Sequence, residues 1–201
     1  MKTFLTIDLD YFGLTFDYIS KEKKKQTIDF FSTLFNSPIP YSVIKYHHEI
    51  LPELNKHKYD KIINIDFHND VTIEDRQNQF INYKEERQIL NEGTWGNFYK
   101  YRKNCIFEWR LPNKQRCLYK GAGICGFFGN YKLEWHPTKM GYKKVFYREG
   151  LDNLPISSIL HIAYCISPNW YYKGNIEFLF KKFPQLNICK EEEFERKKIY
   201  T

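Results

Sequence analysis

The amino-acid sequence predicts an α/β fold with three layers, in which helices cover both faces of a mainly parallel sheet. Short runs rich in Ile, Val, Phe and Tyr alternate with segments of helical periodicity, which is typical of strands that alternate with helices. Several of these runs carry apolar residues on both faces, as expected for strands that are covered on both sides. The 201 residues suffice for one domain with a substantial core, and we expect a single domain over residues 1–201.

Each expected element follows from its composition and period. The candidate strands are short and rich in β-branched and aromatic residues: Thr3–Leu9, Tyr41–Tyr46, Lys61–Asp66, Asn104–Trp109, Lys143–Arg148 and Ser158–Ile166. The candidate helices place apolar residues at helical spacing on a polar background: Phe16–Phe35, His48–Lys56, Ile73–Asn91 and Asn175–Phe183. We interpret the glycine-rich segment Arg110–Gly141 as a loop or insertion that walls a pocket. Its G-x-G-x-x-G string is a weak nucleotide signal, because no clear strand leads into it.

The composition limits the partners of the chain. Its formal net charge is +7, but the basic residues are scattered and mixed with acids, so nucleic acid is an unlikely partner. No segment approaches the length of a membrane span, and we expect no secretory signal because the first residues lack a long apolar stretch. The 5 cysteines are odd in number and form no C-x-x-C pair, which favours reduced thiols in a cytoplasmic protein.

Acidic residues gather where two predicted strands end. Asp66, His68 and Asp70 alternate at the end of one strand, and Asp8 and Asp10 end another. Alternate side chains of an extended segment point the same way, and the carboxyl ends of parallel strands meet at one edge of a sheet. We therefore expect these carboxylates and the imidazole to converge there.

This donor set points to divalent metal ions. Four carboxylates at one edge would repel one another without cations, and the four charges match two divalent metals. A second imidazole comes from Tyr46-His47-His48-Glu49, at the end of another strand. Oxygen-rich ligation with two imidazoles and no cysteine favours manganese, with iron or zinc as alternatives, and argues against a structural zinc site. Two such metals about 3.5–4 Å apart can share and activate a water molecule.

These motifs resemble those of a known family. Asp66-Phe67-His68-Asn69-Asp70 looks like the D-x-H-x-D signature of the arginase-like ureohydrolases, whose fold the histone-deacetylase-type enzymes share, and Asp8-Leu9-Asp10 looks like their D-x-D motif. The D-x-D motif comes first here, whereas it comes second in arginase. That order is similar to a small branch, the peptide arginases of ribosomal peptide maturation. Further likeness lies in the segments His-His-Glu-Ile-Leu-Pro and Asn91-Glu92-Gly93-Thr94-Trp95.

The resemblance implies a role for each motif residue. Two carboxylates would bridge both metals, namely Asp66 and Asp8. One imidazole and one carboxylate would complete each metal, namely His47 with Asp70 and His68 with Asp10. We prefer His47 to His48 because its segment aligns better with the family pattern. A metal-bridging hydroxide would attack the guanidinium carbon of an arginine side chain in a peptide, leaving ornithine and releasing urea.

The resemblance is incomplete at two positions. Arginase has a proton-shuttling His after D-x-H-x-D, and no residue takes that role here; His136 and His161 are more often structural. Glu92 is the candidate carboxylate for gripping the guanidinium, although it also fits a turn before Gly93. Loops that hold the α-groups of free arginine are not recognisable, which favours a precursor peptide as the substrate.

Three other functions remain open from the sequence. A deacetylase-like amidohydrolase of the same fold would use one zinc and leave Asp10 without a role. A phosphohydrolase would use Asp8 as its nucleophile, but Phe12 stands where that pattern expects Thr or Val. A non-catalytic binding module would hold no metal. The segment Ser167-Pro168-Asn169 reads equally as a turn or as a site loop.

Overall fold

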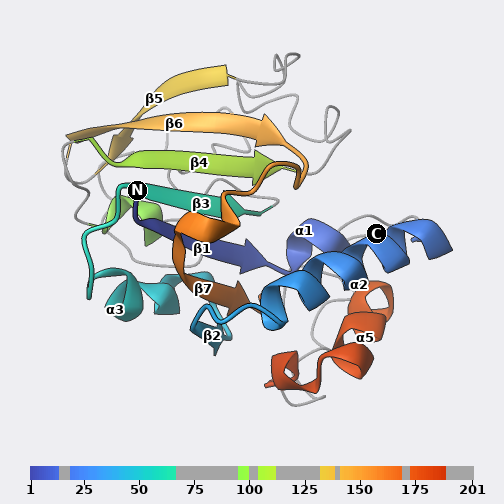
Figure 1. The fold of residues 1–201 in the computed structure, drawn as a ribbon. Helices are drawn as coiled ribbons and strands as arrows, with labels where there is room; N and C mark the ends of the chain where they lie inside the picture. Colours follow the sequence, from blue (N-terminus) through green and yellow to red (C-terminus); the bar gives the residue numbers. More distant parts are fainter. Residues whose placement is uncertain are drawn as a thin grey trace.

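A computed structural model describes residues 1–13, 19–66, 95–99, 104–111, 132–138, 141–168 and 173–188. Seven strands in this part form one sheet, in the order β2-β7-β1-β3-β4-β6-β5 (Figure 1). The strands are β1 (Thr3–Asp8), β2 (Tyr41–Ile44), β3 (Lys61–Ile65), β4 (Ile106–Leu111), β5 (Lys132–Thr138), β6 (Gly141–Glu149) and β7 (Ile159–Cys165). Neighbours from β2 to β6 run parallel, while β5 pairs antiparallel with β6. The predicted mainly parallel sheet is confirmed.

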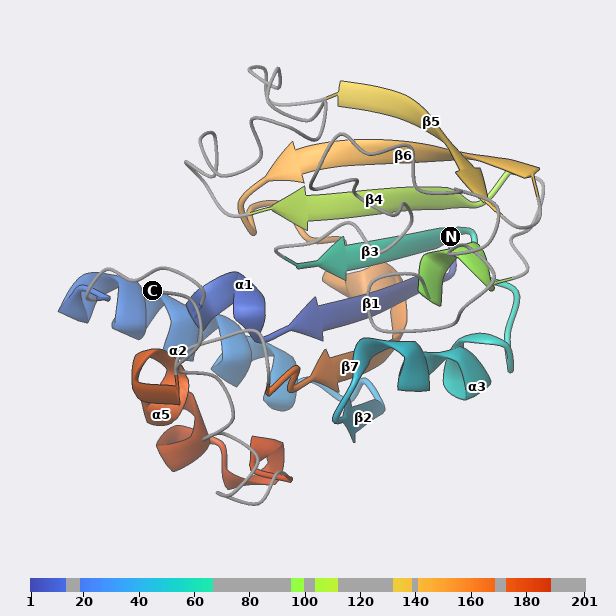
Figure 2. The same ribbon diagram turned by 180° about the vertical axis from the view of Figure 1, so that it is seen from behind.

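Helices lie on both faces of this sheet, which makes three layers (Figures 1 and 2). One face carries α1 (Asp10–Gly13), α2 (Lys21–Phe35) and α5 (Lys173–Lys182), with the 3₁₀ helix η5 (Pro184–Leu186) after α5. The other face carries α3 (Leu51–Leu54) and the 3₁₀ helices η1 (His47–Ile50) and η2 (Trp95–Asn97). A further 3₁₀ turn, η4 (Ile156–Ser158), leads into β7. The three-layer α/β class predicted from the sequence is therefore confirmed.

Strand β1 shows how the sheet divides the core. All six of its residues are buried. Leu5 and Ile7 pack in one apolar cluster with residues of α2 and α5, whereas Phe4 packs in a second cluster with α3 and η2. Successive side chains of a strand point to opposite faces, so a strand with apolar side chains on both faces suits a place between two layers. We call the face that bears Phe4 the α3 face.

The helix boundaries follow local chemistry. The hydroxyl of Ser20 accepts a hydrogen bond from the backbone N–H of Lys23 at 3.2 Å, which caps the start of α2. The helix predicted over Phe16–Phe35 therefore begins later than expected, and residues 14–18 lie outside the described residues. The helix predicted over His48–Lys56 is instead η1 followed by α3, with a proline in the first turn of α3.

One strand was missed in the sequence. Residues Lys132–Thr138 form β5 within the segment that we interpreted as a loop, Arg110–Gly141, so that interpretation is wrong for these residues. Pro137 pairs with Tyr142 of β6, and β5 has β6 as its one strand neighbour in the described sheet. An edge strand tolerates a proline that a central strand excludes, which is why the pattern was unreadable as a strand. The helix predicted over Ile73–Asn91 lies outside the described residues.

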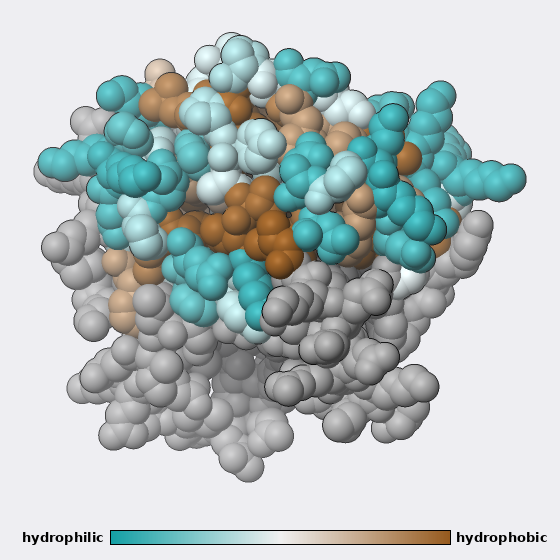
Figure 3. Space-filling model, turned by 90° about the horizontal axis from the view of Figure 1, so that it is seen from below, coloured by the Kyte–Doolittle hydropathy of each residue, from teal (hydrophilic) through white to brown (hydrophobic). Residues whose placement is uncertain are grey.

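The described surface is mixed in polarity. On the side seen from below in Figure 1, hydrophilic side chains surround a central group of apolar ones (Figure 3). No helix in the described part of the chain combines the length and apolar character needed to cross a bilayer.

Candidate metal centre

Three carboxylates meet at the carboxyl edge of the sheet. Asp8 is the last residue of β1, and Asp66 follows the last residue of β3. The two strands pair in register up to Ile7 and Ile65, so Asp8 and Asp66 come next side by side. Asp10 begins α1, two residues further on. One oxygen from each of these three carboxylates lies within 4.8 Å of the others, and the residues are 3%, 1% and 1% exposed for Asp8, Asp10 and Asp66.

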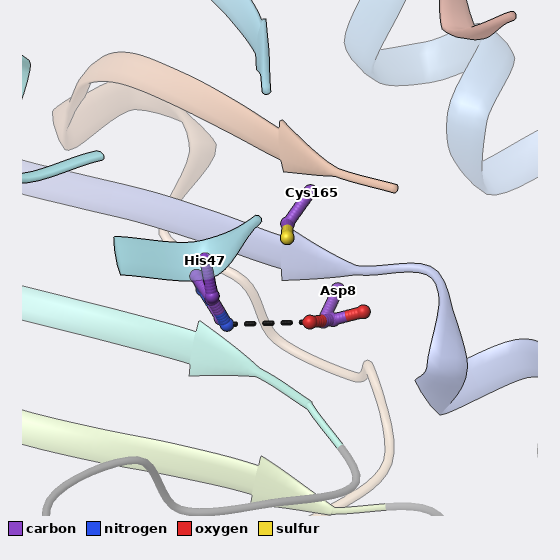
Figure 4. Close-up of side chains that lie close together, drawn as sticks. All are labelled: Asp8, His47 and Cys165. Atoms are coloured by element: carbon purple, nitrogen blue, oxygen red, sulfur yellow. Dashed lines mark ion pairs between the residues drawn. The ribbon is translucent and has the colours of Figure 1, made fainter. Parts of the chain in front are cut away.

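His47 lies against two of these carboxylates. Its Nδ1 is 3.3 Å from Oδ2 of Asp8 and 3.0 Å from Oδ2 of Asp66 (Figure 4 draws the Asp8 contact). Its Nε2 is 2.7 Å from the hydroxyl of Thr6, and the residue is 1% exposed. The neighbouring ring of His48 is half-buried and lies 6.1 Å from the ring of Tyr46, which it stacks on. The structure thus places His47, rather than His48, at the carboxylates.

A local turn aims His47 at the site. The side chain of Glu49 accepts hydrogen bonds from the backbone N–H groups of Lys45 and Tyr46, at 2.9 and 3.2 Å. These bonds tie down the start of η1 directly after β2, where helix N–H groups lack partners within the helix. A metal bound at Nδ1 of His47 would require the hydrogen on Nε2, and the hydroxyl of Thr6 stands there to accept it.

Hydrogen bonds orient the carboxylates as well. Asp8 accepts from the backbone N–H of Asp10 at 3.1 Å through Oδ1, and from the hydroxyl of Ser167 at 2.5 Å through Oδ2. Asp66 accepts from the side-chain amide of Asn64 at 3.3 Å. The indole N–H of Trp109 donates to the backbone carbonyl of Asp66 at 2.9 Å. Such outer contacts fix the direction of ligand atoms before a metal arrives.

The donor set fits a divalent cation. Three buried carboxylates within 4.8 Å repel one another, and moving charge out of water is costly unless an opposite charge lies nearby. Carboxylate oxygens together with one imidazole nitrogen suit manganese, iron or zinc. The described residues therefore offer Asp8, Asp10, Asp66 and His47 as candidate ligands for such an ion.

Two residues at this edge were not assigned to the site from the sequence. Cys165, the last residue of β7, groups with Asp8 and His47 within 4.8 Å. Ser167 was read equally as a turn or a site residue, and its hydrogen bond to Asp8 places it at the site. The end of an apolar strand is the signal that marks Cys165, as it marked Asp8. Ser167 has a φ of 45°, a left-handed conformation that is strained for a residue with a Cβ.

Other predicted site residues lie elsewhere. His68, Asp70 and Glu92 are outside the described residues. His136 is on β5, which β3, β4 and β6 separate from β1. The ring of His161 stacks on Phe4 and hydrogen-bonds through Nε2 to the hydroxyl of Ser42 at 3.1 Å, four residues before the end of β7. The contacts of His161 favour a structural role over proton shuttling, and the strand of His136 lies away from the candidate site.

Comparison with known proteins leaves the family open. No family model, no curated protein and no solved structure matched this chain. The case for a function therefore rests on the motifs of the sequence and on the geometry of the carboxylate edge.

Proposed function

We propose that this protein is a binuclear metal hydrolase of the peptide-arginase type, which converts arginine side chains in a ribosomally made precursor peptide to ornithine and urea. The observation that carries the proposal is the convergence of Asp8, Asp10 and Asp66 beside His47. These residues come from the D-x-D motif, the strand-end histidine and the start of D-x-H-x-D. Segments far apart in the sequence thus supply four of the six donors of the proposed binuclear centre.

The proposed centre holds two manganese ions, with iron or zinc as alternatives. Asp8 and Asp66 would be ligands of both ions, and Nδ1 of His47 lies within 3.3 Å of both carboxylates. Asp10 would complete one ion together with His68, and His47 would complete the other together with Asp70. Bound metals would supply a water activated near neutral pH and would offset the carboxylate charges.

The chain's own residues position these groups. The hydroxyls of Thr6 and Ser167 hold His47 and Asp8 in place, while the indole of Trp109 holds the backbone at Asp66. Glu92 is proposed to pair with the substrate guanidinium, as a carboxylate can accept both of its parallel N–H bonds.

Geometry favours this proposal over two alternatives. A deacetylase-like site with one zinc leaves no role for Asp10, yet that carboxylate is 1% exposed and lies within the cluster. A phosphohydrolase needs Asp8 as an accessible nucleophile, yet Asp8 is 3% exposed, and its Oδ2 is held by Ser167 and lies near His47. A site that buries both carboxylates together is better suited to metal ligation.

Metal content and peptide mass together test the proposal. The full chain is expressed with manganese, iron and zinc all available, and its bound metals are measured. We expect close to two ions per chain, at least one of them manganese. The loaded protein is then incubated with arginine-containing peptides, and we expect each modified arginine to lose the mass of urea less one water. A metal-free protein, or a single zinc with deacetylation of acyl-lysine peptides, would contradict the proposal.

Two variants locate the activity. Asp66→Asn removes a bridging charge, so we expect turnover and metal to be lost while the far-UV circular dichroism stays unchanged. The matched control is Asp29→Asn, which changes an exposed carboxylate on α2 and should leave both intact. Glu92→Gln should raise KM for the peptide without altering metal content. Ornithine formation by Asp66→Asn at the wild-type rate would sink the metal mechanism.

A further inference from the structure

A thiol lies in the same row of the sheet as the site carboxylates. Cys165 pairs with Asp8 in the register of β7 and β1, and both side chains lie on the α3 face with Ala163 and Phe4. Cys165 is 0% exposed. Its sulfur, a nitrogen of His47 and an oxygen of Asp8 all lie within 4.8 Å of one another (Figure 4).

The thiol is connected to the carboxylate through one hydroxyl. The sulfur of Cys165 is 3.1 Å from Oγ of Ser167, and that Oγ donates its hydrogen to Oδ2 of Asp8 at 2.5 Å. Because a hydroxyl has a single hydrogen, Ser167 can only accept from the thiol while it donates to Asp8. The sulfur also lies 3.8 Å from the carbonyl oxygen of Lys45. The thiol hydrogen is therefore directed at polar atoms at the edge of the site.

The structure thus contains two overlapping donor sets that share Asp8. The oxygen set consists of Asp8, Asp10 and Asp66, and the mixed set consists of Asp8, His47 and Cys165. Oxygen donors suit hard ions such as manganese, whereas thiolate and imidazole favour zinc and cobalt over manganese. The mixed set has the carboxylate, imidazole and thiolate donors that zinc binds in proteins.

We propose that Cys165 is a metal ligand, and that it makes the His47 side of the centre a position selective for zinc or cobalt over manganese. This inference rests on the metal centre of the proposed function and assigns it a donor outside the D-x-D and D-x-H-x-D motifs. Binding forms a metal–sulfur bond, and the thiol proton leaves to solvent. The oxygen set remains the position for a hard ion, so the two positions differ in metal preference.

Cobalt provides a probe of the bond itself. The full chain is stripped of metal with a chelator, dialysed and titrated with Co²⁺ under reducing, anaerobic conditions. Bound cobalt gives visible d–d absorption with any ligand set, whereas a cobalt–thiolate bond adds a charge-transfer band in the near ultraviolet. We expect both signals in the wild-type protein. We expect Cys165→Ser to keep the visible absorption and lose the near-ultraviolet band.

Controls separate Cys165 from the other thiols. Cys105 is also buried, and its sulfur contacts the carbonyl oxygen of Ile106 at 3.7 Å, so Cys105→Ser should keep the band. In competition experiments, Cys165→Ser should lower the preference for Zn²⁺ over Mn²⁺ by about tenfold or more. If Cys165→Ser fails to fold, a second variant can show whether Cys165 binds cobalt. This variant retains Cys165 and replaces the other cysteines by serine. We expect the band to persist in that variant.

The outcomes distinguish this inference from the proposed function. Visible cobalt absorption without a thiolate band in the wild-type protein would overturn the role of Cys165 and leave the metal centre standing. A band that survives in Cys165→Ser would also overturn it, because the sulfur would belong to another cysteine. A wild-type protein that binds no cobalt, zinc or manganese would overturn both the inference and the proposed function.

Discussion

Two buried clusters of ionisable side chains occupy opposite faces of the same sheet. The metal-centre cluster consists of Asp8, Asp10, Asp66 and His47, and its strand-end carboxylates Asp8 and Asp66 lie on the α3 face. The second, which we call the arginine cluster, consists of Lys61, Glu108 and Arg110. Glu108 pairs in register with Ile63, which packs toward α2 and α5, so the arginine cluster points away from the site.

In the arginine cluster, two basic side chains compensate the negative charge of Glu108. Oε2 of Glu108 lies 2.5 Å from Nζ of Lys61, and Oε1 lies 2.6 Å from Nε of Arg110. Burial is the largest single influence and raises the pKa of Glu108, but the Lys61 hydrogen bond and the Arg110 charge outweigh it, so the pKa is lowered. The guanidinium also donates to the backbone carbonyls of Asp152 and Asn153, at 2.6 and 3.4 Å. This cluster thereby fastens the loop between β6 and β7.

The metal-centre cluster is built differently. Within the described residues, Asp8 and Asp66 form their ion-pair contacts with His47, which is charged only when protonated. Carboxylates gathered around an imidazole have the composition of a ligand set, whereas a carboxylate between lysine and arginine has that of a structural ion pair. The comparison teaches that the partner of a buried carboxylate, more than its burial, distinguishes a candidate metal site from a structural ion pair.

The largest effect should come from breaking the arginine cluster. Arg110→Met leaves Glu108 buried with half of its compensation and frees two loop carbonyls. We expect a loss of about 3–5 kcal/mol in the free energy of unfolding, measured by urea denaturation. The double variant Glu108→Gln/Arg110→Met should recover part of that loss, since it leaves no uncompensated charge. Lys181→Met, which changes a largely exposed side chain on α5, serves as the control. A wild-type-like stability for Arg110→Met would remove the contrast between the clusters.

Metal removal should give the next largest effect on stability. Whether Asp66→Asn stabilises or destabilises the protein should depend on whether metal is bound. A metal present at about one hundred times its Kd stabilises the native state by about 2.7 kcal/mol, and a chelator should abolish that gain. Asp66→Asn should be less stable than wild type with metal, but equal or more stable without it, because one repelling charge is gone. Thermal unfolding with and without chelator measures both. A loss of stability in the metal-free variant would show that Asp66 is a structural carboxylate.

Two substitutions of Ser167 can separate the effect of its hydroxyl contact from the effect of its backbone strain. Ser167→Ala removes the hydrogen bond to Asp8 but keeps the left-handed φ of 45°, so we expect metal affinity to fall by about tenfold. Ser167→Gly removes the same hydroxyl and relieves the strain, so the metal-free protein should gain stability while affinity falls equally. Isothermal titration with Mn²⁺ measures the first effect and thermal unfolding the second. Unchanged affinity in both variants would make Ser167 a turn residue alone.

Much of the fold could be predicted from the sequence because the central strands are buried on both faces. All six predicted strands are present, and their ends differ from the expected ones by no more than two residues. Strand β5 was not predicted because an edge strand needs no continuous apolar run and accepts a proline. The start of α2 was placed too early because the capping hydroxyl of Ser20, rather than the apolar pattern, decides where the helix begins.

The candidate site could also be predicted only in part. Asp8, Asp10, Asp66 and His47 were predicted to converge because carboxyl ends of parallel strands share an edge, and the structure brings them together. Cys165 could not be assigned, because its place beside Asp8 depends on the register between β7 and β1. Register is set by how strands pair across long sequence separations, and local spacing does not encode it. The hydroxyl of Thr6 was not assigned for the same reason, and Ser167 was left open between a turn and a site loop.

The smallest expected effect on stability comes from the half-buried pair of His161 and Glu53. This pair is intermediate in character between the two buried clusters. Burial is the main cause that lowers the pKa of His161 below its ordinary value; Glu53 raises it, while Lys56 and His57 lower it further. A histidine with a lowered folded-state pKa binds fewer protons when folded than when unfolded. Its contribution to stability is therefore present above about pH 6.5 and is lost as the pH falls through the folded-state pKa.

This loss can be isolated from that of the carboxylates. The pKa values of Glu53 and Glu108 are both lowered, so their contributions are lost only in more acidic solution, below about pH 4.3. Between about pH 6.5 and 5, the chelated wild-type protein should lose stability more steeply than His161→Gln, by less than about 1.4 kcal/mol per pH unit. Lys181→Met, the exposed control used above, should follow the wild-type slope. Equal slopes for wild type and His161→Gln would show that the ring is as easily protonated in the fold as in water, which would set it apart from both buried clusters.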